Sequence, residues 1–242
     1  MIFRTLINSL ILMSMLLLPI VSEAATAVGK VLFITVGNTA DARTPDGGLR
    51  KLKLGDSIYV GERISTDANT KLHLEFNDKA RFYLGTNAEF EVEKFQSKST
   101  SKNDDAFHSR VFKGTFRFVS GLIARSTGKS MRVRVSVATI GIRGTHVEGV
   151  VTERQEKDGK MVDSSAQVVL LEPEEEGKKT SIEVSNEFGS VVIDQPGFGT
   201  DIPDEKSPPS PVRKMQLRSI DDIQRAIRSS VRQGGTARPR MP

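Results

Sequence analysis

Short runs in which apolar and polar residues alternate one by one limit most strongly how this chain can fold. Such runs occupy residues 71–76 and 80–84, and Asn77-Asp78-Lys79 separates them. A period of two places the apolar side chains on one face of a β-strand, so the two runs predict a hairpin whose aromatic face meets a core. Before the C-terminal tail, no segment of ten or more residues shows a helical period. The chain is therefore predicted to be all-β, with short antiparallel strands in a sandwich or a rolled β-helical arrangement.

Two further alternating runs are interrupted. In residues 90–95 the alternation places Lys94 on the inner face, which predicts that this strand ends there. In residues 110–119 the interruption is Gly114, and a glycine inside a strand indicates a kink or a bulge.

A third alternating run, residues 133–137, leads into Gly141 and Gly144, which flank Arg143. Glycines inside a strand are expected where the chain bends or another backbone approaches closely. Arg143 is always charged, so it either faces water or is satisfied by carbonyls and carboxylates. It could bind an anionic ligand, or it could clamp neighbouring carbonyls and hold the bend. The clamp is the preferred interpretation, and it predicts that Arg143→Ala lowers stability.

The N-terminus has the pattern of a secretory signal peptide. Arg4 precedes an apolar run at residues 6–21, and Ser22-Glu23-Ala24 supplies the small residues of a cleavage site. Residues 1–24 are therefore predicted to be a cleaved signal peptide, with an uncleaved anchor as the alternative. The mature protein is expected in the periplasm.

The composition agrees with a globular protein in an oxidising compartment that does not rely on disulfides. Apolar residues make up 37% and charged residues 27% of the sequence, and there is no cysteine. The fold must therefore be stabilised by its core, which is more typical of a bacterial envelope protein than of an animal secreted domain.

The net charge of +5 lies in the C-terminal tail. From residue 203 onward nine Lys and Arg face four Asp and Glu, whereas residues 25–202 sum to zero. The globular part therefore has no overall field to attract a polyanion, and no nucleic-acid partner is expected.

The tail from residue 196 is predicted to be Pro-rich, basic and disordered, with one short amphipathic helix near 215–232. One side of that helix carries the apolar residues Leu217, Ile220, Ile223 and Ile227. Arginines lie toward its C-terminal end, as the helix dipole favours. The helix could dock on a partner protein, contact an anionic membrane surface, or pack back on its own domain.

No metal, cofactor or catalytic site is predicted. His146 and Glu148 share one strand face, but no third ligand follows and cysteine is absent. The acidic run at Glu172 and 174–176 lacks the spacing of a calcium loop and is interpreted as solvated. No nucleophile elbow, two-His metal motif or nucleotide fingerprint occurs, so the protein is predicted not to be an enzyme.

Several segments together resemble the FecR domain of bacterial envelope proteins, over roughly residues 28–152. The matching segments are Leu54-Gly55-Asp56, Val60-Gly61-Glu62-Arg63-Ile64-Ser65-Thr66, Leu74-Glu75-Phe76-Asn77-Asp78, Thr86-Asn87, the residues from Gly114 to Arg117, and Ala138-Thr139-Ile140-Gly141-Ile142-Arg143-Gly144-Thr145. The resemblance implies a periplasmic β-rich module for protein or ligand contacts, without known catalytic residues. Its motif residues, structural or interacting, are Gly114, Arg117, Thr139, Gly141, Arg143, Gly144 and Thr145. Lys79 stands where the family usually has glycine, which predicts a different turn.

These observations predict a signal peptide at 1–24, a FecR-like β domain at 25–152, an appended β segment packing on the same domain at 153–195, and the tail at 196–242. The expected function is a non-catalytic periplasmic interaction module in envelope sensing or signalling, whose partner is an envelope protein or a small ligand. Two alternatives remain open. One is an envelope hydrolase with a carboxylate or serine site assembled by the fold. The other is a polyanion or lipid-surface binder acting through the tail.

Overall fold

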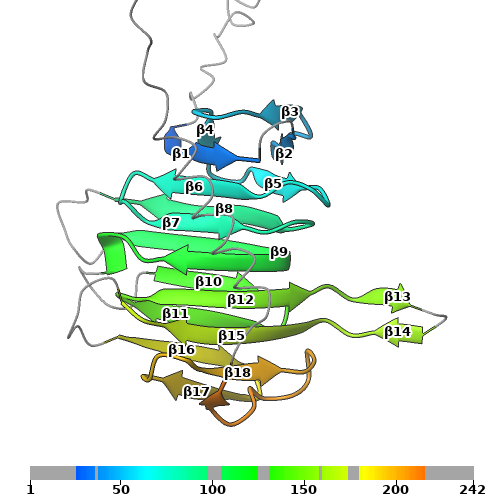
Figure 1. The fold of residues 1–242 in the computed structure, drawn as a ribbon, viewed down its shortest axis with the longest axis vertical. Helices are drawn as coiled ribbons and strands as arrows, with labels where there is room; N and C mark the ends of the chain where they lie inside the picture. Colours follow the sequence, from blue (N-terminus) through cyan, green and yellow to red (C-terminus); the bar gives the residue numbers. More distant parts are fainter. Residues whose placement is uncertain are drawn as a thin grey trace, which may run out of the picture.

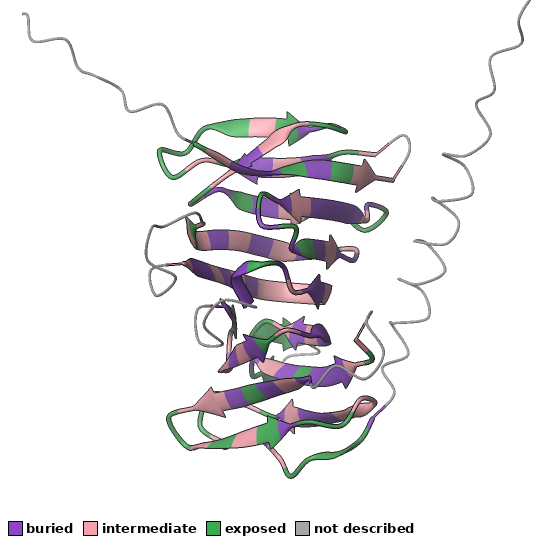
Figure 2. Cartoon of the chain, turned by 90° about the vertical axis from the view of Figure 1, so that its left-hand side faces the viewer, coloured by how far each residue is buried: buried purple, intermediate pink, exposed green. Residues whose placement is uncertain are grey.

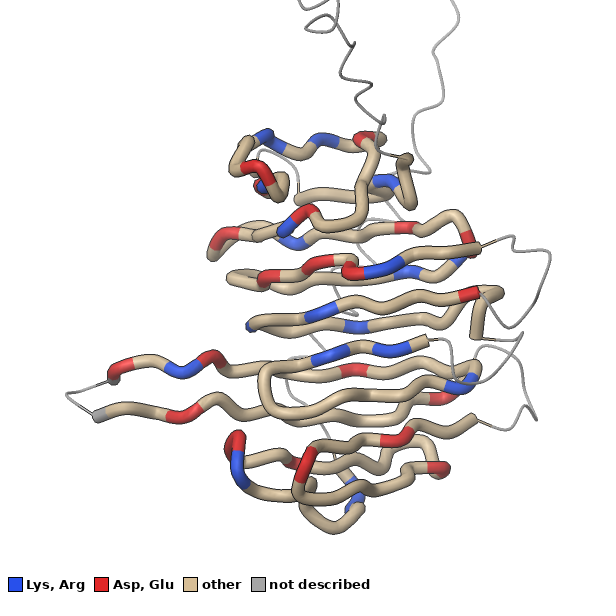
Figure 3. The backbone as a smooth tube through the Cα atoms, turned by 180° about the vertical axis from the view of Figure 1, so that it is seen from behind, with Lys and Arg blue, Asp and Glu red and all other residues tan. Residues whose placement is uncertain are grey.

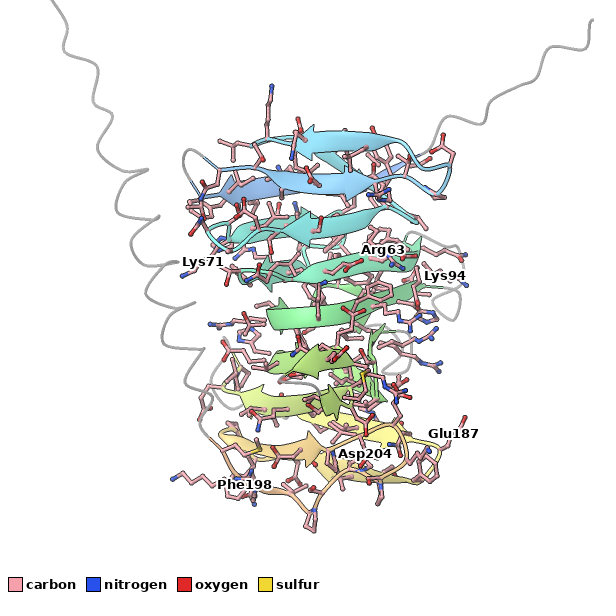
Figure 4. The ribbon with its side chains drawn as sticks, turned by 90° about the vertical axis from the view of Figure 1, so that its right-hand side faces the viewer. Arg63, Lys71, Lys94, Glu187, Phe198 and Asp204 are labelled. Atoms are coloured by element: carbon pink, nitrogen blue, oxygen red, sulfur yellow. The ribbon has the colours of Figure 1, made fainter. Side chains whose placement is uncertain are left out.

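Two β-sheets packed face to face form the part of the chain that the computed structural model describes, namely residues 26–35, 38–97, 105–124, 131–157, 160–173 and 180–215. The strands lie one above another along the long axis of the molecule (Figure 1). Figure 4 shows the two sheets edge-on, with Lys71 on one side and Lys94 on the other. The prediction of an all-β sandwich or rolled arrangement is confirmed.

The two sheets have similar strand orders and share one long strand, β9. Sheet A consists, in spatial order, of β4 (Ser57–Tyr59), β1 (Ala27–Ile34), β6 (Leu72–Phe76), β7 (Arg81–Leu84), β9 (Ala106–Val119), β12 (His146–Thr152), β15 (Ser165–Leu171), β18 (Phe198–Ile202) and β19 (Arg213–Lys214). Sheet B consists of β3 (Leu49–Leu52), β2 (Ala40–Arg43), β5 (Arg63–Thr66), β8 (Glu89–Gln96), β9, β10 (Met131–Val135), β11 (Ala138–Arg143), β16 (Ser181–Asn186) and β17 (Gly189–Ile193). Neighbouring strands are antiparallel except β9 and β10, which are parallel. Strands β13 (Gln155–Lys157) and β14 (Lys160–Val162) pair separately in a hairpin that projects from the stack (Figure 1).

A phenylalanine cluster fills the space between the sheets. Its fully buried members are Phe76, Phe82, Phe90, Phe107, Phe116 and Phe118. Each comes from an alternating strand whose intervening residues face outward, so buried and more exposed bands alternate along the strands (Figure 2). Complete burial of one such side chain stabilises a fold by about 1.5–3 kcal/mol, which allows this core to replace disulfides.

The β6–β7 hairpin is formed as predicted, and both Leu74 and Phe82 face the core. Its turn corrects one expectation. Lys79 has a φ of +70°, the left-handed conformation that a glycine would adopt there. The turn therefore keeps a glycine-like backbone in spite of the lysine, at a conformational cost of roughly 1–2 kcal/mol.

Strand β8 continues past Lys94 to Gln96, contrary to the prediction that it ends there. The register with β9 shifts between Val92 and Lys94, and this bulge turns Lys94 outward. Phe95 can then contact the ring of Phe107, with ring centroids 5.5 Å apart.

The ordered fold also extends beyond the predicted tail boundary at residue 196, because β18 pairs with β15. Gly199 permits this approach, since a Cβ atom there would lie 2.3 Å from the Val168 carbonyl oxygen. The proline-rich segment is then anchored by hydrogen bonds from Thr200 Oγ1 to the Ser210 carbonyl (2.7 Å) and from Asn186 Nδ2 to the Ser207 carbonyl (2.8 Å). Strands β15, β16 and β17 continue both sheets, so these strands of the predicted appended segment are integral to the sandwich, whereas the β13–β14 hairpin is not.

Three predictions lie outside the described residues: the signal peptide at 1–24, the helical stripe of Leu217, Ile220, Ile223 and Ile227, and the acidic residues 174–176. Within the described ranges, no helix is long and apolar enough to cross a membrane.

Candidate functional site

The segment from Ala138 to Thr145 is the place where the chain passes from sheet B to sheet A. Strand β11 ends at Arg143 in sheet B, and β12 begins at His146 in sheet A. Gly144 makes the corner with a φ of +64°. Thr145 is buried in the corner, and its carbonyl accepts a hydrogen bond from the Ser120 N–H at 3.1 Å.

Gly114 marks the second crossing. Strand β9 pairs with β8 and β10 before Gly114 and with β7 and β12 after it. Gly114 has a φ of +93°, and a Cβ atom there would lie 2.5 Å from the Cα atom of Ala88. The kink predicted at Gly114 is therefore present, and it bends β9 from one sheet into the other.

Arg143 does not clamp the bend. Its side chain is exposed, and among the described residues no carbonyl or carboxylate lies within hydrogen-bonding distance of its guanidinium. Gly141 is not required by close packing either, because a Cβ atom there would meet the Glu183 carbonyl at an ordinary 3.8 Å. The interpretation of Arg143 as a carbonyl clamp is thus corrected, and Gly144 alone provides the corner.

Within the motif at residues 60–66, Glu62 forms a buried ion pair with Arg50 near one end of the sandwich. Glu62 is 2% exposed and accepts hydrogen bonds from Arg50 Nε at 3.0 Å and Arg50 Nη2 at 2.8 Å. The Tyr59 N–H donates to the same carboxylate at 3.1 Å. This bidentate pair ties β3 to the β4–β5 turn, so Glu62 has a structural role.

Arg117 lies on the outer face of sheet A, beside Glu148. Its Nη1 is 3.8 Å from Glu148 Oε1, and its guanidinium lies 6.0 Å from the centre of the Tyr83 ring. Glu148 is buried, so this pair is screened far less by water than a surface pair. The two residues meet because β12 pairs with β9 in a register that places Glu148 directly opposite Arg117.

The same face holds an aromatic stack around His73. The imidazole lies 4.8 Å from the Phe33 ring and 4.6 Å from the Tyr83 ring, measured between centroids. Burial, with a smaller contribution from the positive charge of Lys71, lowers the pKa of His73 from 6.5 to about 4. His73 is therefore neutral at physiological pH.

His146 and Glu148 do share one face of β12, as their spacing predicts. Across the described residues, however, no group of three or more His, Asp or Glu side chains is arranged to hold a metal ion. The arrangement of this face instead points to packing and ion pairing.

Sheet B presents a group of positive charges on its outer face, at the level of Gly141. Cross-strand pairing places Lys94 opposite His108, His108 opposite Arg132, and Arg132 opposite Gly141. Arg143 lies two residues from Gly141 on the same face of β11. We call Lys94, His108, Arg132 and Arg143 the basic patch; basic residues gather on neighbouring strands here (Figure 3).

The arginines of the basic patch make no ion pair with a described residue, although the exposed Glu183 lies opposite Gly141 on the same face. On the same face, Arg63 forms ion pairs with Glu89 and Glu91, and Arg134 forms an ion pair with Glu93. Within the described ranges, no carboxylate lies within ion-pair distance of Arg132 or Arg143.

The pKa of His108 is affected first by its burial and then by the charges around it. Burial, together with the charges of Arg132 and Lys94, lowers the pKa of His108, and Glu93 opposes the shift. Like charges directly opposite one another in a sheet are unfavourable by a few tenths to about 1 kcal/mol. Sequence reasoning missed this patch because the bulge that turns Lys94 outward, and the parallel pairing of β9 with β10, leave no simple signal in the alternation.

Comparison with known proteins agrees with the fold. The model of the family described as FecR protein matches residues 62–186, slightly more than half of the chain. The chain therefore belongs to the FecR protein family, as the motifs predicted. The match extends through β16 and so includes most of the segment expected to be an appendage.

The solved structures that are similar to this chain include one of low sequence identity. It is the crystal structure of a candidate anti-sigma factor from Parabacteroides distasonis ATCC 8503, with 14% sequence identity, a TM-score of 0.45 and coverage of 66% of this chain. This chain spans 62% of the length of that protein. No curated protein matches the sequence.

Proposed function

We propose that this FecR-family protein is a non-catalytic binding module of bacterial envelope signalling, and that its basic patch binds an acidic segment of another envelope protein. Family membership supports a regulatory, signalling role. The apolar run and cleavage pattern of residues 1–24 support a periplasmic location.

One observation carries the proposal: Arg132 and Arg143 are exposed and lack carboxylate partners among the described residues, whereas Arg63 and Arg134 on that face have them. Arginine binds carboxylates in a bidentate geometry, and an acidic segment would also reduce the repulsion among the charges of Lys94, Arg132 and Arg143. Because the contacts are solvent-exposed, the complex should weaken as the salt concentration rises.

A hydrolytic function draws no support from the described residues. The buried carboxylates of Glu62 and Glu148 lie against Arg50 and Arg117. The buried Asp78 accepts a hydrogen bond from the Ala80 N–H at 3.0 Å and thereby closes the β6–β7 turn. Each of these acidic groups serves the fold.

The proposal is tested by affinity capture from a bacterial envelope extract with the immobilised mature chain. The Arg132→Gln/Arg143→Gln variant should lose proteins that the unaltered chain retains at low salt. Lys53→Gln/Lys214→Gln removes two exposed charges far from the patch and serves as the control, which should retain them. If the Arg132/Arg143 variant retains the same proteins as the control, the basic patch is not the binding surface.

A further inference from the structure

Part of the outer face of sheet A is shielded from water. Cross-strand pairing places on this face a row that consists of Phe33, His73, Tyr83, Arg117, Glu148 and Val169. They alternate with core residues such as Leu74 and Phe82, so they point away from the space between the sheets. His73 is nevertheless only 8% exposed and Val169 only 2%, whereas Val192 on the outer face of sheet B is 62% exposed.

Side chains on a sheet stand roughly perpendicular to it, so their tips stay in water unless another element lies over them. Met215 begins such a cover. It is 7% exposed and packs on Val169, beside the half-buried Val150 and Leu171. Its N–H donates to the Gly197 carbonyl at 2.9 Å, which fixes the chain on this face at the last described residue.

We propose that residues 217–231 of the same chain dock their apolar stripe on the outer face of sheet A, over this row. The stripe is that of Leu217, Ile220, Ile223 and Ile227. Only Gln216 separates it from Met215, so the docking segment begins beside this face.

The length of the proposed docking segment matches the width of the row on sheet A. A helix of residues 217–231 would be roughly 22 Å long at 1.5 Å per residue. The four strand spacings from β15 through β12, β9 and β7 to β6 cover about 19 Å at 4.8 Å each. A segment that starts beside Val169 can therefore reach His73 at the other end of the row.

The charges agree with this occupant as well. The segment carries Arg228 at the edge of its apolar stripe, and the covered face contains Glu148 and, nearer its far end, Glu75. The Phe33 and Tyr83 rings already flank His73, and a docked tail would exclude further water that could solvate the charged imidazole.

The test uses the complete mature chain and follows the His73 imidazole by NMR. Ile223→Ser/Ile227→Ser should move the His73 titration upward from about 4 toward 6.5, by at least about one pH unit. The control Asp222→Ser/Arg225→Ser changes two residues on the opposite side of the predicted helix at constant net charge, and it should leave the titration unchanged.

A second measurement locates the segment directly. The chain has no cysteine, so Asp222→Cys provides a unique site for a nitroxide label. The label should broaden the amide signals of Tyr83 and Arg117 in its own chain. Broadening that appears only in a mixture of labelled and unlabelled chains would show docking on a second copy and overturn the proposal. No broadening, with His73 unchanged in the Ile223/Ile227 variant, would also overturn it.

Discussion

Substitution by alanine should lower the free energy of unfolding by very different amounts at three glycines of the family motifs, because the structure gives these glycines different roles. At Gly114 the added Cβ would lie 2.5 Å from the backbone of Ala88, and the φ of +93° is unfavourable for alanine. Overpacking costs about 1–3 kcal/mol, and the left-handed backbone costs about 1–2 kcal/mol. Alanine also restricts the unfolded chain more than glycine does, which offsets about 0.4–1 kcal/mol of this loss. Gly114→Ala should therefore lower the free energy of unfolding by about 2–4 kcal/mol.

Gly144 and Gly141 provide the matched comparisons. Gly144 has a φ of +64° but no neighbouring atom within 4 Å of the added Cβ, so alanine should cost only about 0.5–1 kcal/mol. Gly141 has neither a positive φ nor a close contact, and alanine there should leave stability unchanged or raise it by up to about 0.5 kcal/mol.

Urea unfolding followed by far-ultraviolet circular dichroism measures all three variants against the unaltered chain. Equal slopes with urea concentration would show that the native and unfolded states are comparable among variants. A Gly141→Ala loss as large as that of Gly114→Ala would refute the assignment of the two sheet crossings to Gly114 and Gly144.

Two further predictions concern His73 and Lys79. Between pH 6.5 and about 4, His73 binds a proton in the unfolded chain but not in the folded one. The free energy of unfolding therefore decreases as the pH is lowered through this range. His73→Phe should therefore gain roughly 2–3 kcal/mol relative to the unaltered chain between pH 7 and 4.5 in urea titrations, and equal pH dependence of the two chains would contradict the buried imidazole. Lys79→Gly should raise the free energy of unfolding by about 0.5–1 kcal/mol because the φ of +70° no longer costs energy. Lys79→Ala keeps the strain and should show no gain in thermal melting; a gain as large as that of glycine would point to the lysine charge instead.

The alternation of residues 71–84 was sufficient to predict a hairpin and its core face, because local periodicity decides which side of a strand is buried. The crossing at Gly114 was equally visible as a break in an alternating run. The glycines around residue 144 also predict the bend there, but the carbonyl-clamp role predicted for the neighbouring Arg143 is wrong. The side-chain partners of Arg143 depend on which strands lie beside β11, and sequence spacing does not contain that information.

The same limitation applies to the site. Lys94, His108 and Arg132 come from three different strands, and they meet only because β8 bulges and β9 pairs in parallel with β10. The ion pair of Arg117 with Glu148 likewise arises from long-range register. The abundance of proline and glycine in residues 196–215 predicts a disordered tail, yet β18 lies there and needs Gly199 for its close approach to β15.

The central claim is that the basic patch serves binding and contributes little to the fold. Thermal melting of Arg132→Ala/Arg143→Ala, beside the capture assay, tests it most directly. Both side chains are exposed, so the melting temperature should stay within about 2 °C of the unaltered chain while the retained envelope proteins are lost. A large drop in melting temperature, or full retention of those proteins by the variant, would contradict the account.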